Sequence, residues 1–557
     1  MNRFQELCET HAPTLAAARN AIATREFYAR WAEAPSGKIY GETANADGEV
    51  TFNNQRGNQF TRLVQQGDAW HGEEESPYGI SMGITYPVSS AANLMSRAET
   101  AQKQWSALTA DDRAAVLIEC LERAAKDFFE IGYATQHTTG QGFVMAFQAS
   151  GPHSFDRALE SVATGHAALT QFATEQTWVK PMGKISVTVQ KRFHAVPKGV
   201  NVTIGCSTFP IWNSVPGMFA SLMTGAATVA KVHPKVVYPL AILVASMQHT
   251  LQSLGLDPHI VQLGVPSPEH PLTMELIANP RTGTVDYTGS PSFGAEVERV
   301  CMQHGKVCFT EKAGVNTVAV ESVENLDAVL DNLAFSILLY SGQMCTAPQN
   351  FFIPESGITT PDGTVSPDEF ASRLAAKIDA LAANEKMAQT FGAIQNPSTL
   401  ERITSAAGQG ATVIRPSAAL AQPGFENARS VTPLLLKAAA TQRDIYEREW
   451  FGPIAFVIPV GDFTQAITLM AESVRSHGAL TTSVYSTNPD MQDYAERELI
   501  AAGAPVAFNF TGSIWINQSA AFSDFHGTGA NPAGNASFAD LNFVAARYNV
   551  IGTRRIG

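Results

Sequence analysis

A cysteine in a polar turn and a glutamate at the end of an apolar stretch are the residues best suited to catalysis. Residues 342–347 read Gly-Gln-Met-Cys-Thr-Ala and place Cys345 after the apolar stretch 333–340. Glu311 follows the apolar stretch 307–310. A thiolate attacks carbonyl carbons, and a carboxylate can take a proton from water. The pair predicts covalent catalysis, with Cys345 as nucleophile and Glu311 as general base. The alternative is an inert buried cysteine and a surface carboxylate.

A second motif predicts phosphate binding. Gly289 and Ser290 follow the strand-like stretch 284–287, and the sequence then reads Pro-Ser-Phe-Gly to Gly294, as at the start of a helix. Backbone N–H groups at a helix N-terminus bind phosphate, so Gly289, Ser290 and Gly294 are predicted to bind a dinucleotide. A simple helix cap is the alternative. The sequence has no G-x-G-x-x-G fingerprint.

Short apolar strands alternate with helices from residue 197 onward, which is typical of a parallel, Rossmann-like sheet. The predicted strands are 200–204, 227–230, 259–263, 284–287 and 307–310. A second alternating series runs from residue 316 to about residue 500. Residues 1–35 and 88–176 have helical patterns, and residues 36–80 read as irregular and polar. Residues 185–189 and 543–551 are predicted as edge strands for oligomerisation.

These patterns predict an α/β chain in several parts. The predicted parts are an N-terminal extension (1–80), a dinucleotide-binding domain (81–180 and 197–310), a catalytic domain (311–505) and oligomerisation strands (181–196 and 540–557).

Composition excludes several partners. The 557 residues carry a net charge of −13, which argues against nucleic acid as a partner. No apolar run is long enough to span a membrane. The six cysteines show neither paired nor metal-ligand spacing, so no metal site is predicted and a reducing cytoplasm is expected.

Residues 342–347, Glu311 and residues 285–290 together resemble the aldehyde dehydrogenase superfamily. The resemblance implies that family's fold: a Rossmann-like domain, an α/β catalytic domain and a β-strand oligomerisation arm. It also implies a thioester on Cys345 that water, activated by Glu311, hydrolyses to a free acid. Lys231 would contact the adenosine ribose, Glu449 the nicotinamide ribose, and Phe451 would pack near the ring.

The cofactor preference predicted from sequence rests on Pro234. NAD-preferring relatives often carry a glutamate at this place, where its carboxylate would bind ribose hydroxyls and repel a 2′-phosphate. This chain has Pro234 there and so lacks that carboxylate, and His233 and Lys235 flank Pro234. The sequence therefore favours NADP over NAD, unless these charges are simply solvated.

The chain also departs from the family pattern. The position of the usual oxyanion-hole asparagine is Thr208, and Asn213 lies nearby, so either side chain could donate that hydrogen bond. Asn350 replaces a common arginine. Residues 525–532 replace the usual glycine-rich segment.

Residues 208–214, 342–350, 38–42 and 75–79 narrow the resemblance to the PaaN branch, the stand-alone aldehyde dehydrogenases of phenylacetic-acid degradation. That branch implies a ring-opened, coenzyme-A-linked semialdehyde as substrate, a homodimer or homotetramer, and a separate ring-opening hydratase. The alternatives are a dehydroadipyl-CoA semialdehyde dehydrogenase of benzoate breakdown, acyl transfer to coenzyme A, and a non-catalytic dinucleotide-binding relative.

Overall fold

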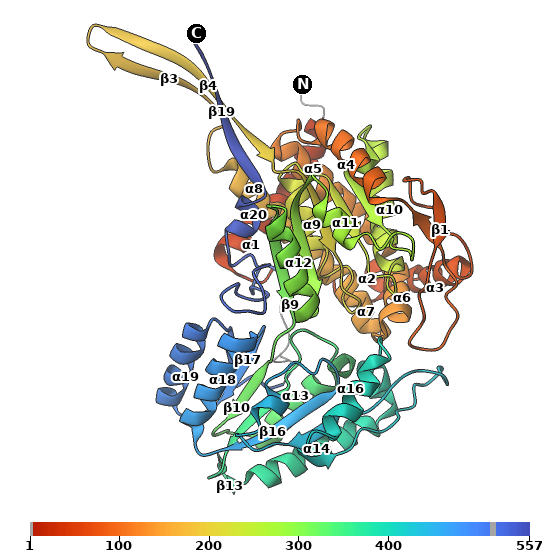
Figure 1. Cartoon of the computed structure of the whole chain (residues 1–557), viewed down its shortest axis with the longest axis vertical. Helices are drawn as coiled ribbons and strands as arrows, with labels where there is room; N and C mark the ends of the chain where they lie inside the picture. The colour runs from red at the N-terminus through yellow and green to blue at the C-terminus, as the bar shows by residue number, and fades with distance from the viewer. Residues whose placement is uncertain (1–3, 513–519, 557) are drawn as a thin grey trace.

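Two large β-sheets, one parallel and one mainly parallel, form the framework of the molecule, and a three-stranded arm extends from it (Figure 1). The computed structural model describes residues 4–512 and 520–556. The chain passes from the first sheet to the second between β9 and β10, so residues just after residue 312 join the two halves.

The first sheet confirms the predicted Rossmann-like arrangement. Its parallel strands, in spatial order, are β7 (Val261–Gly264), β6 (Thr228–Lys231), β5 (Val200–Ile204), β8 (Thr282–Gly289) and β9 (Val307–Lys312). β5, β6 and β7 are buried along their whole length, as expected when helices cover both faces of a parallel sheet.

Helices pack on both faces of this sheet and form separate apolar clusters. One cluster contains α4 (Ala91–Trp105), α11 (Thr273–Ala278) and α12 (Pro291–Gln303). The other contains α5 (Ala110–Ala124), α9 (Val215–Met223) and α10 (Tyr238–Ser253). The remaining elements of this half are α6 (Phe128–Thr139), α7 (Phe143–Ser150), α8 (Pro152–Thr170), η1 (Ala125–Asp127) and η2 (Pro258–Ile260).

The N-terminal extension contains more helix than its polar sequence predicts. Its elements are α1 (Gln5–Thr24), α2 (Gly37–Tyr40), α3 (Ala44–Gln55) and β1 (Ala69–His71), which pairs with β2 (Tyr86–Val88). The expectation that residues 36–80 are irregular is wrong for α3. This helix forms because buried Phe52 stacks on Tyr133 and Tyr238, a tertiary contact that local composition does not reveal.

The second sheet has six parallel strands and one antiparallel edge strand. In spatial order they are β14 (Thr412–Arg415, antiparallel), β15 (Leu434–Lys437), β16 (Ile454–Val460), β11 (Asn350–Pro354), β10 (Thr317–Val320), β17 (Thr482–Tyr485) and β18 (Val506–Phe508). Its helices are α13 (Leu326–Leu338), η3 (Leu339–Gly342), α14 (Pro367–Ala382), η4 (Glu385–Met387), α15 (Ala388–Phe391), α16 (Ser398–Ala407), α17 (Arg443–Tyr446), α18 (Phe463–His477) and α19 (Pro489–Ala502). A small hairpin joins β12 (Ile358–Thr360) and β13 (Gly363–Val365).

The arm pairs β3 (Glu175–Met182), β4 (Ile185–Pro197) and β19 (Tyr548–Ile556) antiparallel, with β4 in the middle. Both boundaries differ from the predicted 181–196 and 540–557. The first strand begins at Glu175, and residues 542–545 form α20 (Asn542–Ala545) instead of strand. That turn is helical because Phe543 and Val544 pack against Phe309 of β9. No helix in the described ranges is long and apolar enough to cross a membrane.

A buried ion pair joins the C-terminal segment to the first sheet. The Arg547 guanidinium donates to both carboxylate oxygens of Asp286, at 2.6 and 2.8 Å, and the Arg547 side chain is fully buried. Asn201 and Ser221 complete the network, at 2.7 Å each. This bidentate pair fixes the chain immediately before β19 to the middle of β8.

Candidate active site

Cys345 follows a strained turn of left-handed backbone. Tyr340, Ser341 and Gly342 have φ values of 51°, 50° and 60°. This conformation costs a residue with a side chain about 1–3 kcal/mol. The Tyr340 hydroxyl donates to the Thr139 carbonyl at 2.6 Å and so holds the turn. A Cβ at Gly342 would lie 2.5 Å from the backbone of the facing loop, so the turn requires glycine there.

One buried asparagine fixes the backbone around Cys345. Asn316 Nδ2 donates to the carbonyls of Cys345 and Ala347, at 2.8 and 2.9 Å. Its Oδ1 accepts from the N–H groups of Leu480 and Thr481, at 3.0 and 3.1 Å. Asn316 thereby ties the Cys345 turn to segment 479–481, and sequence reasoning gave it no role.

Glu311 lies at the carboxyl end of β9 and is buried. Asn213 Nδ2 donates to Glu311 Oε1 at 3.0 Å, and Asn213 Oδ1 accepts from Cys206 Sγ at 3.5 Å. The Thr208 side chain also hydrogen-bonds to Cys206. Of the two candidate oxyanion donors, Asn213 therefore contacts Glu311 directly, and Thr208 lies one residue further from Glu311 in this network.

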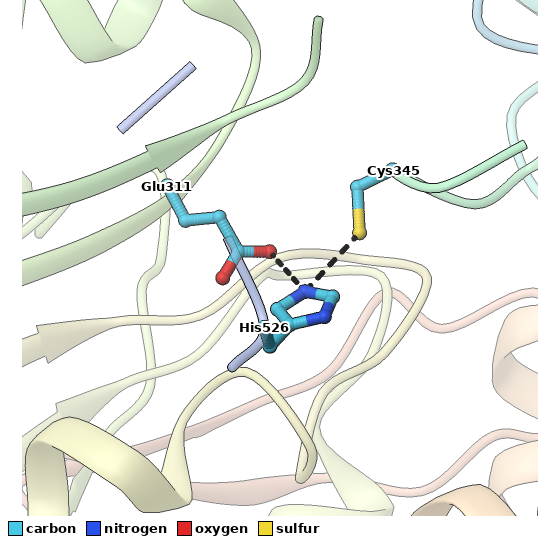
Figure 2. Close-up of side chains that lie close together, drawn as sticks. All are labelled: Glu311, Cys345 and His526. Atoms are coloured by element: carbon cyan, nitrogen blue, oxygen red, sulfur yellow. Dashed lines mark hydrogen bonds and ion pairs between the residues drawn. The ribbon is translucent and has the colours of Figure 1, made fainter. Parts of the chain in front are cut away.

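The structure adds a third catalytic-type side chain, His526 (Figure 2). His526 Nε2 lies 3.1 Å from Glu311 Oε1 and 3.7 Å from Cys345 Sγ. His526 is 7% exposed, and its ring meets Trp212 edge to face. Sequence reasoning noted that residues 525–532 depart from the family pattern but gave this histidine no role. A histidine inside that departure was the available signal.

The loop that carries His526 is fastened to the same parts of the fold as the other two residues. Asn531 Nδ2 donates to the Ala479 carbonyl at 3.1 Å, in the segment that also holds the Cys345 turn. The Asn535 N–H donates to the Thr310 carbonyl at 2.9 Å, one residue before Glu311. Shared anchors therefore fix the positions of all three side chains relative to one another.

The charges in this site favour a carboxylate and disfavour a thiolate in the absence of substrate. Burial and the Glu311 charge hold the pKa of Cys345 well above its ordinary value. Burial opposes ionisation of Glu311, but His526 and Arg157 favour the carboxylate, and the net direction of its pKa is downward. Arg157 is itself buried, and its guanidinium lies 4.7 Å above the Trp212 ring. The thiol needs a proton acceptor before it can attack.

A single nitrogen of His526 faces both partners. If Nε2 is unprotonated, it can accept the Cys345 thiol proton; if it carries a proton, it can donate to Glu311. These two hydrogen bonds exclude each other, because one nitrogen cannot be donor and acceptor at once. The arrangement can therefore pass a proton away from the thiol.

A cavity of about 360 Å³ lies at the carboxyl ends of β6 and β7. Its lining includes Lys231, Pro234, Ser267 and Glu73. Burial lowers the pKa of Lys231 to about 8. Cavities at the carboxyl edge of an open parallel sheet are common binding places for nucleotides.

Comparison with known proteins decides the family. Residues 85–537 match the model of the aldehyde dehydrogenase family. The chain belongs to the aldehyde dehydrogenase family. It is an NAD(P)-dependent aldehyde dehydrogenase, which oxidises an aldehyde to an acid, and it has the α/β fold of that family.

Individual relatives agree with this assignment. A crystal structure of an NAD-dependent aldehyde dehydrogenase from Burkholderia multivorans is 43% identical, with a TM-score of 0.95 over 99% of this chain and 98% of that one. A succinate-semialdehyde dehydrogenase [NADP(+)] from Deinococcus radiodurans is 24% identical over 80% of this chain and 86% of its own. A Thermus 1-pyrroline-5-carboxylate dehydrogenase with bound NAD shares the fold, at 17% identity and a TM-score of 0.74 over 96% of this chain and 99% of that one.

Two buried ionisable side chains of this aldehyde dehydrogenase, Lys231 and Glu449, fit a dinucleotide. Within residues 4–512 and 520–556, no side chain pairs with the Lys231 ammonium. Burial raises the pKa of Glu449 to about 8, and its charge acts on Tyr287, which hydrogen-bonds to the Ser290 carbonyl at 2.9 Å. An unpaired buried ammonium suits a phosphate or a ribose hydroxyl, and the Glu449 carboxyl suits ribose hydroxyls.

Three other predicted residues take more definite places. The Ser290 hydroxyl accepts from the Phe293 N–H and caps α12, so capping is present whether or not phosphate binds. Gly294 is buried, and a Cβ there would lie 2.8 Å from the Lys312 side chain, so the packing of α12 also requires glycine at this position. Phe451 is half-buried beside Glu449.

Asn350, which replaces the usual arginine, links the nucleophile region to the Glu449 segment. Its amide donates to the Tyr446 carbonyl at 2.9 Å. The neighbouring Gln349 accepts from the Trp450 N–H at 2.9 Å. The two amides therefore join the start of β11, just after Cys345, to the segment that carries Glu449.

Proposed function

We propose that this enzyme oxidises a ring-opened, coenzyme-A-linked semialdehyde of aromatic catabolism to its carboxylic acid. The oxidation rests on one observation: Cys345, Glu311 and His526 converge on a single buried site. The substrate class is supported by the branch motifs at residues 208–214 and 342–350.

The proposed reaction uses the three side chains in sequence. His526 takes the Cys345 thiol proton, and the thiolate attacks the aldehyde carbon to give a thiohemiacetal. The Cys345 N–H and either Thr208 or Asn213 stabilise the oxyanion. Bound NAD(P) supplies the hydride acceptor. The resulting thioester is hydrolysed by water that Glu311 activates, and the acid leaves.

A turnover assay tests this function. Reduced nicotinamide would be followed by absorbance with aliphatic, aromatic and coenzyme-A-linked semialdehydes, each with and without free coenzyme A. We expect the highest kcat/KM with a coenzyme-A-linked semialdehyde and a free acid as product in both conditions. An acyl-CoA product that forms only with added coenzyme A would show that the enzyme transfers the acyl group to coenzyme A instead of hydrolysing the thioester. A simple aldehyde as the best substrate would overturn the substrate class.

His526→Ala should lower kcat about 10²–10⁴-fold, the usual contribution of a general base. Added imidazole should restore part of this loss, because it can enter the space left by the ring and accept the thiol proton. Cofactor binding, measured by fluorescence, should be unchanged. If imidazole restores nothing while the variant is folded, His526 only positions Glu311.

The N-terminal extension places carboxylates beside the cofactor cavity. Glu74 is buried; it accepts from the Val237 and Tyr238 N–H groups, at 2.5 and 2.8 Å, and from the Tyr86 hydroxyl at 2.6 Å. This anchor at the start of α10 holds the neighbouring residue Glu73 on the lining of the cavity.

These carboxylates change the expected cofactor preference. Pro234 alone favours NADP, but Glu73 lines the same cavity as Lys231, and Glu75 lies 3.8 Å from Lys235 and offsets its charge. A 2′-phosphate would meet like charge there. We therefore infer that Glu73 takes over the role of the missing family glutamate and that the enzyme prefers NAD.

Glu73→Gln should raise kcat/KM for NADP relative to NAD about 10-fold, because it removes one like charge from a partly solvated site. Initial rates with each cofactor at saturating aldehyde measure the ratio. Glu75→Gln is the matched control, since Glu75 does not line the cavity and its loss should alter the ratio less. Equal NADP-to-NAD ratios for wild type and Glu73→Gln would mean that Glu73 does not set the cofactor preference and that the prediction from Pro234 stands.

We also propose a homodimer or homotetramer built through the arm. Exposed apolar side chains lie along all three arm strands: Trp178, Val179, Met182, Ile185, Phe193, Val550, Ile551 and Ile556. An arm with so much exposed apolar surface gains stability when another subunit covers it.

All six cysteines are free, which supports the expected reducing cytoplasm.

A further inference from the structure

The geometry points to a second ligand for the catalytic centre: we propose that Zn²⁺ binds Cys345, His526 and Glu311 and reversibly inhibits the enzyme. The proposal rests on the proposed function only in that these residues are taken as the catalytic groups. The sequence predicts no metal site, because the three ligands lie far apart along the chain and no spacing pattern reveals them.

The ligand types and their spacing match zinc. Thiolate sulfur, imidazole nitrogen and carboxylate oxygen are the usual zinc ligands, at about 2.3, 2.0–2.1 and 2.0–2.2 Å. Tetrahedral angles then separate sulfur from nitrogen by about 3.6 Å and nitrogen from oxygen by about 3.4 Å. Here Cys345 Sγ and His526 Nε2 lie 3.7 Å apart, and His526 Nε2 and Glu311 Oε1 lie 3.1 Å apart. All three ligand atoms lie within 4.8 Å of one another.

The site is also organised before any ion arrives. The Glu311 and His526 side chains are 7% and 5% exposed, so few alternative positions are open to them. Asn213 donates to Glu311 at 3.0 Å and supplies the outer-shell bond that orients a carboxylate ligand. Figure 2 shows the thiol, the imidazole and the carboxylate turned toward one space.

Charge balance permits binding and limits its strength. Zinc coordination displaces the thiol proton to solvent, which leaves a thiolate and a carboxylate, with a neutral imidazole, around the ion. The buried Arg157 guanidinium acts on both anionic ligands and opposes a further cation. Three protein ligands leave the fourth position to water. We therefore expect an ion that chelators remove, unlike a structural zinc.

Zinc and catalysis exclude each other in this arrangement. The ion would occupy the nucleophilic sulfur, the nitrogen that accepts its proton and the base that activates water. Cofactor binding uses the separate cavity at the ends of β6 and β7 and should continue. The expected behaviour is full loss of turnover with retained cofactor binding, reversed by EDTA.

The test uses purified full-length protein stripped with EDTA and titrated with Co²⁺, whose thiolate charge-transfer absorption reports a sulfur ligand. We expect one equivalent of Co²⁺ to produce that band, Zn²⁺ to remove it by competition, and Zn²⁺ to inhibit turnover over the same concentration range. Glu311→Gln and His526→Gln should each weaken binding more than about 100-fold, beyond what loss of an outer-shell partner costs. Circular dichroism and cofactor binding confirm that each variant is folded.

Cys301→Ser is the matched control, because Cys301 and Cys308 form a second pair of neighbouring thiols away from the site. It should leave the cobalt spectrum and zinc inhibition unchanged. A band that survives in both His526→Gln and Glu311→Gln, or disappears in Cys301→Ser, overturns the zinc site. If neither Co²⁺ nor Zn²⁺ binds while turnover still depends on Cys345, the zinc site is also overturned, but the proposed function stands. Zinc binding without inhibition would overturn the proposed inhibition and would also refute the catalytic roles of these three residues.

Discussion

Cys345→Ala should lower turnover with every aldehyde by at least about 10⁴-fold, since removing the nucleophile of a covalent mechanism removes nearly all of the chemistry. No other side chain shown at the site replaces it. Cys206, the nearest other thiol in the network, donates to Asn213, and burial raises the pKa of its thiol. Reduced-nicotinamide absorbance measures the loss.

The same variant should bind the cofactor normally. Lys231 and Glu449 lie on other elements, so a loss confined to kcat identifies Cys345 as the reacting group. Cys301→Ala, a buried thiol on α12, is the control and should keep wild-type activity. Activity above about 1% of wild type in Cys345→Ala would contradict the covalent mechanism.

Arg547→Met should destabilise the protein by about 3–5 kcal/mol, the usual effect of breaking a buried ion pair from one side. The change leaves the Asp286 carboxylate buried beside Asn201 without its bidentate partner. Urea unfolding followed by circular dichroism should show a lower midpoint. The double variant Arg547→Met with Asp286→Asn should recover part of the loss, because it no longer buries an unpaired charge.

The control for this prediction is Arg299→Met. Arg299 pairs with Glu296 on the exposed face of α12, and exposed pairs of this kind contribute little to stability. Its midpoint should match that of wild type. An equal shift in both arginine variants would mean that loss of arginine, and not loss of the buried pair, is responsible.

Local pattern predicts the first sheet well and tertiary contacts poorly. β5 has the predicted bounds: its sequence Val-Asn-Val-Thr-Ile alternates apolar and polar residues as a strand does, and all five are buried in the parallel sheet. α3 and α20 were missed because each is stabilised by rings from distant helices and strands, Phe52 on Tyr238 and Phe543 on Phe309.

The candidate site also contains some residues that local sequence predicts and others that depend on tertiary contacts. Cys345 and Glu311 lie in local motifs that predict a nucleophile and a base, and the structure brings them together with His526. Asn316 has no local signal, and His526 has only its place in the unusual segment 525–532, because the positions of both depend on contacts of segment 479–481 with two distant loops. The sequence-based NADP prediction does not take Glu73 into account, because this carboxylate comes from a different part of the chain than Pro234.

The order of these residues along the chain has a consequence during synthesis. The ribosome makes the strands of both sheets before it makes His526, and domains generally fold from the N-terminal side as they emerge. A nascent chain can therefore contain folded sheets and Cys345 while it still lacks the group that takes the thiol proton. With His526 as the proposed proton acceptor, we expect Cys345 to become reactive only when the loop at Asn531 docks.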